Sequence, residues 1–426
     1  MHFLFYLFIH VSSSLAQVSI KYSAVLYSSG FNPSIKPYPT DPLRYEEAWP
    51  YKYSELFEIG KRQHHALGQW FGERYLKESL NGCTPVTIFA RSIDEDAFIK
   101  SAQASLAGMC LPNVSNNFTN AYFSQQPIFI TTIPVKEDEI LAMKRVCPKY
   151  GKLRQEYLNT EPYKDGLNSY KELLNYLSEH TNWTVENYYD INEIYNILLI
   201  EDLYNLALPN WTQAVFPQKL KEPACHSYAL PSATPSMARL LVGPLIKEIV
   251  NNMSRAITIM PSDVILSVYS GSDNTIGNVL TALDLFDGKC PPFIATILME
   301  LLYDNYANNF YVRILYQNTS DMTEPYAMAI PNCGTLCDFT TFTEIYGHLI
   351  SVDWEADCKE DEDFLTDLQI FLLLLCLFLL ALGFHCAYGL IYYSRRNFVS
   401  DEDFTGVVMM VEMFVHPPIM PGSPPE

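Results

Sequence analysis

Three clusters of polar residues could do chemistry in this chain, and each follows a short run of residues typical of β-strands. The clusters are Tyr27-Ser28-Ser29, Arg91-Ser92 and Ser272-Asp273. The carboxyl ends of neighbouring parallel strands meet at one edge of a sheet, which is where open α/β folds bind ligands. The sequence therefore predicts one pocket lined by hydroxyls, a guanidinium and a carboxylate. The plainer alternative is that polar residues simply mark the ends of strands.

The elements that would position these clusters alternate along the chain. Residues 19–27, 86–90 and 263–269 favour strands because β-branched and aromatic residues are frequent in them. Amphipathic patterns predict helices over residues 54–77 and 95–106, after the first two strands. A strand, helix, strand, helix order implies parallel pairing. We therefore expect an α/β protein with a mainly parallel central sheet flanked by helices.

A helical and tyrosine-rich stretch interrupts this alternation at residues 135–258. We expect it to form an inserted helical subdomain, so that the α/β domain consists of residues 17–134 and 259–358. The last helix of the insertion, over residues 236–257, is expected to return the chain to the core. Residues 309–316 alternate between apolar and polar side chains and predict a further strand.

Apolar segments near both ends of the chain predict a signal peptide and a membrane span. Residues 1–16 combine an apolar run with a small-residue cleavage site, as in a secretory signal peptide. Residues 370–393 are almost entirely apolar, and a bilayer span needs ~20 such residues. An acidic stalk at 359–369 precedes this span and two arginines follow it, which places the tail at 394–426 in the cytosol. The sequence predicts a single-pass type I membrane protein of the cell surface or lysosome.

The composition narrows the class of partners. The formal net charge is −20, from 48 acidic and 28 basic side chains, so we expect no nucleic-acid partner. No Gly-rich phosphate loop and no zinc-spaced Cys/His set occurs, so no cofactor and no metal is expected. Six Asn-x-Ser/Thr sequons on the predicted lumenal side predict glycosylation, at Asn113, Asn117, Asn182, Asn210, Asn252 and Asn318.

Cysteine use agrees with a lumenal domain. Eight cysteines precede the apolar span, an even number that indicates disulfides in an oxidising compartment. They are Cys83, Cys110, Cys147, Cys225, Cys290, Cys333, Cys337 and Cys358. Cys376 and Cys386 lie within the apolar span and are expected to stay unpaired.

Motifs at three places in the chain are shared with one known family. They are Pro39-Thr40-Asp41-Pro42 with Trp49-Pro50, Tyr269-Ser270 with Asp273, and Glu324-Pro325-Tyr326. Over residues 18–358 the chain resembles the prostatic and lysosomal branch of the histidine acid phosphatases. The resemblance implies their three-layer α/β fold and a phosphate pocket at the strand ends. It leaves a homodimer open, since members of the family form dimers.

The resemblance also implies two disulfides. The family's local bridge corresponds to Cys333 with Cys337, and a long-range bridge corresponds to Cys147 with Cys358. Four lumenal cysteines then remain. We favour pairing Cys83 with Cys110 and Cys225 with Cys290, although sequence alone leaves the other pairings open.

Most of the family's catalytic residues are replaced in this chain. Its chemistry needs a nucleophilic histidine and arginines that hold the phosphoryl oxygens. The resemblance places the first arginine and the nucleophile on Ser28 and Ser29, and the second arginine on Asn32. It places a further histidine on Ser272. Losing such a nucleophile costs on the order of 10⁶ in kcat.

Two charged residues of the family's site are retained. The arginine of the second strand end corresponds to Arg91, and the acid that protonates the leaving alcohol corresponds to Asp273. With the neighbouring charges gone, these two residues are expected to neutralise each other. A serine nucleophile would need an adjacent base. His64 and His65 fall on the first predicted helix, where a surface or packing role is favoured.

We interpret the chain as a membrane-anchored pseudophosphatase that keeps the fold and acts as a binding module for an unidentified lumenal or extracellular ligand. One alternative is an active acid phosphatase that hydrolyses phosphate monoesters with a non-standard nucleophile. Another is that the altered pocket binds a neutral polar ligand.

Overall fold

The structure, a computed structural model, describes residues 18–30, 37–45, 49, 53–77, 82–110, 128–259, 264–318, 324–359 and 364–397. The chain divides into two units, Met1–Lys359 and Glu360–Glu426. Several sequence-based predictions lie outside the described residues: the signal peptide, Asn32, Asn113, Asn117 and the tail beyond Asn397.

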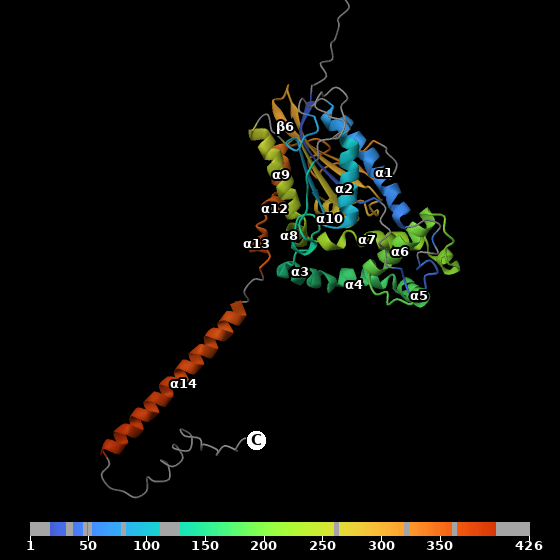
Figure 1. The fold of residues 1–426 in the computed structure, drawn as a ribbon. Helices are drawn as coiled ribbons and strands as arrows, with labels where there is room; N and C mark the ends of the chain where they lie inside the picture. Colours follow the sequence, from blue (N-terminus) through green and yellow to red (C-terminus); the bar gives the residue numbers. More distant parts are fainter. Residues whose placement is uncertain are drawn as a thin grey trace, which may run out of the picture. The chain divides into compact units, whose positions relative to one another are not determined.

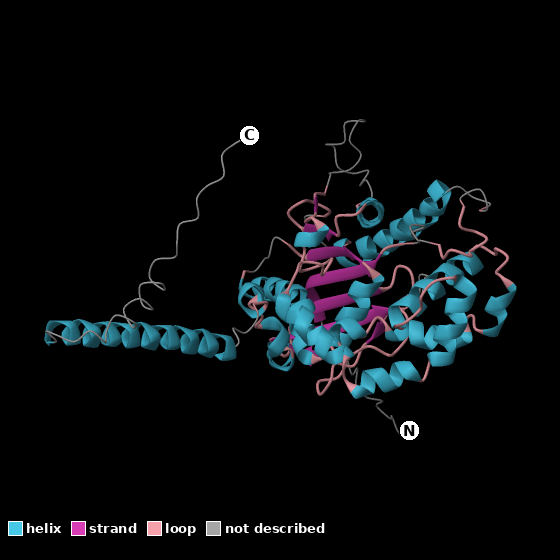
Figure 2. Ribbon diagram, turned by 90° about the horizontal axis from the view of Figure 1, so that it is seen from below, coloured by secondary structure: helices cyan, strands magenta, loops and turns pink. Residues whose placement is uncertain are grey.

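An eight-stranded sheet forms the centre of the first unit (Figure 2), in the order β3-β2-β4-β1-β5-β6-β7 with β8 paired to β6. The strands are β1 (Val18–Ser28), β2 (Ile88–Ser92), β3 (Ile130–Thr131), β4 (Leu266–Gly271), β5 (Thr296–Asp304), β6 (Asn309–Gln317), β7 (Tyr326–Ala327) and β8 (Cys337–Asp338). β1 to β4 pair in parallel, whereas β5 to β8 extend the sheet with antiparallel pairs. The α/β class is confirmed, and the sheet is mixed because the β5–β6 hairpin adds to its far side.

Helices cover both faces of this sheet (Figure 1). On one face lie α1 (Tyr53–Phe71), its π-helical continuation η2 (Gly72–Leu76) and α2 (Asp96–Met109). On the other face lies α9 (Gly243–Thr258). Alternate residues of β1 point to opposite faces, so Val25 packs toward α1 and α2, whereas Leu26 packs toward α9.

Two glycines let α1 and α2 touch. A Cβ atom on Gly68 would lie 1.9 Å from the carbonyl oxygen of Ser105, and one on Gly108 would lie 1.9 Å from that of His65. Any larger side chain would therefore push the helices apart. This close contact holds α1 beneath the end of β1.

A helical region follows β3. Its helices are η3 (Val135–Glu137), α3 (Pro148–Leu158), α4 (Glu161–Asn168), α5 (Lys171–Thr181), α6 (Tyr188–Leu203), η4 (Asn210–Ala214), α7 (Gln218–His226), η5 (Leu230–Ser232) and α8 (Pro235–Leu241). α5, α6 and α7 share a separate core that includes Ile191, Leu198, Leu220 and the ring of Tyr38. One helix was predicted over residues 236–257, where the structure has two, α8 and α9 (Gly243–Thr258). The second of them packs on the sheet.

The remaining helices of the first unit are α10 (Asp273–Ala282), α11 (Phe339–Ile345), α12 (Gly347–Ile350) and α13 (Trp354–Asp357). All four predicted disulfides are present: Cys83–Cys110, Cys147–Cys358, Cys225–Cys290 and Cys333–Cys337. The pairing that sequence left open is thus confirmed.

The second unit contains one long helix, α14 (Phe364–Asn397). Its segment Gln369–Ser394 is long and apolar enough to cross a membrane, judged by length and composition. Cys376 and Cys386 lie on this helix as free thiols.

Candidate functional site

The three polar clusters meet at one edge of the sheet. β4 lies between β1 and β2, with Ser28 opposite Gly271 and Ser92 opposite Ser270. The next two residues of the chain, Ser272 and Asp273, begin α10 directly beyond this edge. The strand ends that carry the three clusters are therefore neighbours, as the strand order predicted.

Ser28 is turned into the protein. Its side chain is buried, and its Oγ donates a hydrogen bond to the carbonyl oxygen of Pro292 at 3.2 Å. The neighbouring carbonyl group of Ser29 accepts a hydrogen bond from the backbone N–H of Ile294 at 3.3 Å. Both contacts fasten the end of β1 to the segment that leads into β5.

Ser272 serves as the N-cap of α10. Its Oγ accepts the backbone N–H of Thr275 at 3.0 Å, and the Thr275 Oγ1 accepts the backbone N–H of Ser272 at 3.1 Å. This reciprocal pair is a capping box, which satisfies two helix N–H groups. The serine hydroxyl is thus used in starting the helix.

The carboxyl group of Asp273 has the raised pKa that is typical of a general acid. Its Oδ2 accepts a hydrogen bond from the hydroxyl group of Tyr228 at 2.9 Å, and its Oδ1 accepts the backbone N–H of Asn274. Burial raises the pKa of the Asp273 carboxyl, an effect that these hydrogen bonds partly oppose. A raised pKa is what a general acid requires. Tyr228, which comes from the segment after α7, was not found from the sequence because no motif marks it.

Arg91 does not pair with Asp273, so that prediction is wrong. Its Nη2 lies 2.7 Å from Asp138 Oδ1, and its Nη1 lies 3.5 Å from Glu248 Oε2. Arg91 is in register with Tyr269, and Tyr269 with Leu26, so the guanidinium lies on the face of the sheet covered by α9. Asp138 is fully buried and also accepts three backbone N–H groups, from residues 140 to 142.

A histidine lies directly beneath the end of β1. His64 of α1 is fully buried, and its ring centroid lies 5.0 Å from that of Tyr27. A Cβ atom on Gly30 would come within 3.1 Å of the His64 Cδ2, so only glycine fits there without a shift. Burial lowers the pKa of His64 to about 3, which leaves a neutral ring at physiological pH. The packing role expected from the sequence fits this position.

Two further glutamates are fully buried away from the strand ends. Glu300 of β5 accepts hydrogen bonds from Arg74, Tyr75 and Arg313. Glu201 of α6 instead faces Asp41, the aspartate of the Pro39–Pro42 motif. Burial, followed by repulsion from Asp41, raises the pKa of Glu201 to about 8.

The mixed α/β sheet flanked by helices is the fold of the histidine phosphatases. A family model described as the histidine phosphatase superfamily (branch 2) matches residues 30–317, which is more than half of the chain. The chain belongs to this family.

Named relatives are similar over most of the chain. Human prostatic acid phosphatase is 30% identical over 362 residues, which cover 84% of this chain and 92% of that protein. Lysosomal acid phosphatase of Xenopus laevis is 31% identical over 355 residues, covering 82% of this chain and 81% of that one. Among solved structures, a Hafnia alvei phytase in complex with tartrate matches 81% of this chain and 100% of its own, with 17% identity and a TM-score of 0.57. The last likeness supports the fold alone.

Proposed function

We propose that this chain is a membrane-anchored member of the acid phosphatase family that has lost catalysis and acts as a lumenal or cell-surface binding protein. The observation that carries the proposal is the set of serines at the strand ends. Ser29 stands where the resemblance places the nucleophilic imidazole, and Ser28 stands where it places an arginine. Without the imidazole, kcat falls by a factor on the order of 10⁶.

The contacts of the remaining polar residues support this proposal. The hydroxyls of Ser28 and Ser272 are used in backbone contacts, and Arg91 is held by two carboxylates. A charge-assisted hydrogen bond contributes ~1.5–3 kcal/mol, so two missing arginines should remove roughly 3–6 kcal/mol of phosphate binding. That loss corresponds to ~10²–10⁴ in affinity. The site should therefore hold inorganic phosphate poorly.

The anchoring part of the proposal rests on the helix α14. Its apolar segment Gln369–Ser394 has the length of a bilayer span, and the arginines that follow favour a cytosolic tail. Deleting residues 364–397 should convert a membrane-bound chain into a secreted one. Recovery of the shortened chain in the membrane pellet would contradict this part.

An active phosphatase is the second candidate, and one observation favours it. His64 is an imidazole within contact distance of the loop that carries Ser29 and Gly30. A base whose pKa is about 3 is weak, however, and its burial keeps it from accepting a proton readily. We therefore favour the inactive protein.

One assay separates the two candidates. The full chain, purified in detergent, is tested with p-nitrophenyl phosphate between about pH 4 and 7, the range in which an acid phosphatase works through ionised arginines and a protonated acid. A variant combining S28R, S29H, N32R and S272H serves as the restored site. We expect no turnover by the native chain and measurable turnover by the variant. Turnover by the native chain that S29A or H64L abolishes would establish the active alternative instead.

A further inference from the structure

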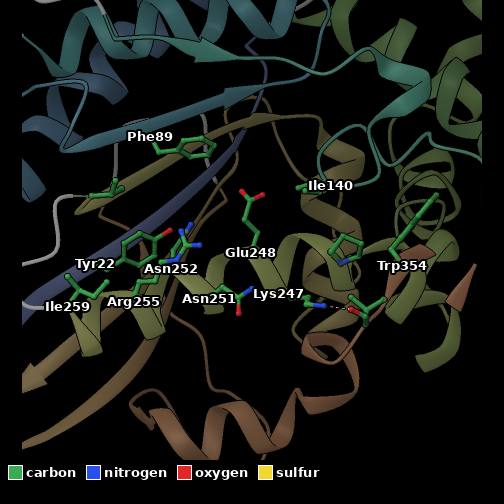
Figure 3. Close-up of a pocket in the computed structure, with 13 residues that line it drawn as sticks. Tyr22, Phe89, Ile140, Lys247, Glu248, Asn251, Asn252, Arg255, Ile259 and Trp354 are labelled. Carbon is green, nitrogen blue, oxygen red and sulfur yellow. Dashed lines mark hydrogen bonds between the residues drawn. The ribbon is translucent and has the colours of Figure 1, made fainter. Parts of the chain in front are cut away.

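A cavity lies on the face of the sheet that α9 covers. Its volume is about 690 Å³, in the range of cavities that hold a drug-sized ligand. Figure 3 shows it between α9 and the sheet. Tyr22 and Phe89 line it from the strands, Trp354 lines it from α13, and Glu248, Asn252 and Arg255 line it from α9.

Asn252 is the acceptor residue of a sequon, Asn252-Met253-Ser254. Figure 3 places its side chain beside Tyr22, on the sheet side of α9. Glu248 lies one turn earlier on the same helix face, and its carboxylate points toward the space between Phe89 and Ile140. A group attached to the Asn252 amide would therefore start at the cavity wall.

The walls suit a sugar. Aromatic rings offer flat apolar surfaces that can pack against the C–H face of a pyranose, and carboxylates and amides accept or donate hydrogen bonds to hydroxyls. Phe89 and Trp354 supply partly exposed rings, while Asn251 and Arg255 supply polar groups.

The carboxylate of Glu248 can accept further hydrogen bonds. Its Oε1 accepts the Tyr269 hydroxyl at 2.7 Å, and its Oε2 is 3.5 Å from Arg91, which is shared with Asp138. One guanidinium between two carboxylates leaves one negative charge uncompensated. The Glu248 side chain is 25% exposed, so this charge faces the cavity. It can accept hydrogen bonds from sugar hydroxyls.

We propose that Asn252 carries an N-linked glycan whose two innermost sugars lie in this cavity. The bond forms on the nascent chain, from a lipid-linked oligosaccharide diphosphate. The Asn252 Nδ2 bonds to C1 of the first sugar, the bond from C1 to the diphosphate oxygen breaks, and an amide proton is lost to balance the charge of the leaving diphosphate. As α9 then packs on the sheet, the inner sugars close the cavity and the outer ones remain outside.

Two other sequons on the same chain provide internal controls. Asn182, at the end of α5, and Asn210, at the start of η4, are both exposed, whereas Asn252 is half-buried. Glycans at exposed sites are open to the enzymes that trim and extend them. A glycan whose base lies in a cavity is shielded from those enzymes, so the three sites should differ in processing.

The test is a site-resolved glycopeptide analysis of the full chain, produced in human cells and purified in detergent. We expect Asn252 to be occupied and to keep an oligomannose glycan, with an oligomannose fraction several-fold higher than at Asn182 and Asn210. An unoccupied Asn252, or a glycan processed as far as those at the two controls, overturns the proposal. If all three sites are unoccupied, the predicted lumenal placement of the domain fails as well.

Variants separate cavity shielding from other causes. F89A removes part of the cavity wall and should raise processing at Asn252 toward the level of the controls, while Asn182 and Asn210 stay unchanged. W354A tests the opposite end of the cavity if F89A does not fold. S254T keeps the sequon and should preserve the oligomannose glycan, and S254A should remove it. Unchanged processing in both wall variants contradicts the proposed position of the sugars.

Discussion

Glu300 and Glu201 are both fully buried glutamates, yet their surroundings neutralise them in different ways. Around Glu300, Arg74 and Arg313 supply two guanidinium groups, with the Tyr75 hydroxyl as a further donor. Around Glu201 no cation lies within salt-bridge distance among the described residues, and a second carboxyl faces it instead.

The difference shows two ways to bury a carboxyl group. At Glu300, charged donors replace the water that burial removes. At Glu201 and Asp41, burial raises the pKa of both carboxyl groups, and repulsion from Asp41 raises that of Glu201 further. The second site should make the stability of the fold depend on pH.

Removing the acceptor at Glu300 should have the largest effect. E300A leaves two arginines facing a buried gap, and breaking a buried ion pair in this way costs ~3–5 kcal/mol. Chemical denaturation of the full chain in detergent measures the loss. E58A is the matched control, because Glu58 forms an exposed pair with Lys61 and should change the free energy of unfolding by less than about 1 kcal/mol. Equal effects of the two variants would show that the arginines do not need Glu300.

The pair of Glu201 and Asp41 should weaken the fold as the pH rises. The folded-state pKa of Glu201 is about 8 and its unfolded value is 4.5, so the folded chain binds more protons between these two pH values. The contribution is complete below pH 4.5 and is lost as the pH rises toward 8. E201Q should flatten this dependence, by an amount on the order of 2–4 kcal/mol. Thermal unfolding at a series of pH values measures it.

E161Q provides the control for that series. Glu161 is exposed at the start of α4, so its replacement should leave the pH dependence as it is in the native chain. A native chain whose stability is the same at pH 5 and pH 8 would contradict the raised pKa of Glu201.

His64 should act in the opposite direction. Burial lowers its pKa from 6.5 to about 3, so the unfolded chain binds more protons between these values. This histidine's contribution is present above pH 6.5 and is lost as the pH falls toward 3. Between pH 7 and pH 5 the loss should be about 2 kcal/mol. H64L should remove it, and H65L, which changes a half-buried neighbour, should retain it.

The smallest effect is expected from Y75F. The change deletes one hydrogen bond to Glu300 and leaves both arginines in place, so the loss should be about 1 kcal/mol. Measured beside E300A, it separates the donor hydroxyl from the ion pairs. A loss as large as that of E300A would mean that the hydroxyl, and not the guanidinium groups, holds the glutamate.

Much of the fold could be predicted because local patterns and tertiary structure agree in it. The runs that became β1, β2 and β4 were predicted as strands, and the intervening helices followed from their amphipathic pattern. β5 was not predicted, since the run from Thr296 to Asp304 is apolar on both faces and cannot be told from a buried helix by periodicity.

The charged partners of Arg91 and the burial of Glu201 could not be predicted from the sequence. The acids that hold Arg91 are distant in sequence, one 47 residues away at Asp138, and no spacing rule connects them. Glu201 lies beside Asp202 near the end of α6, and two adjacent acidic residues at a helix end are typical of an exposed segment. Its burial is a result of tertiary packing, which the local sequence does not indicate. The prediction that Ser28, Ser29 and Ser272 replace catalytic residues, by contrast, comes from the resemblance to a family motif and from no spacing rule.

The bridge between Cys147 and Cys358 joins residues 211 apart, and its second cysteine lies one residue before the end of the first unit. A protease that cuts the chain once anywhere between these two positions would separate it into two pieces that still share a covalent link. The piece bearing the N-terminus would stay attached to the one bearing α14. Separating the two pieces of such a nicked chain would then require a reductant.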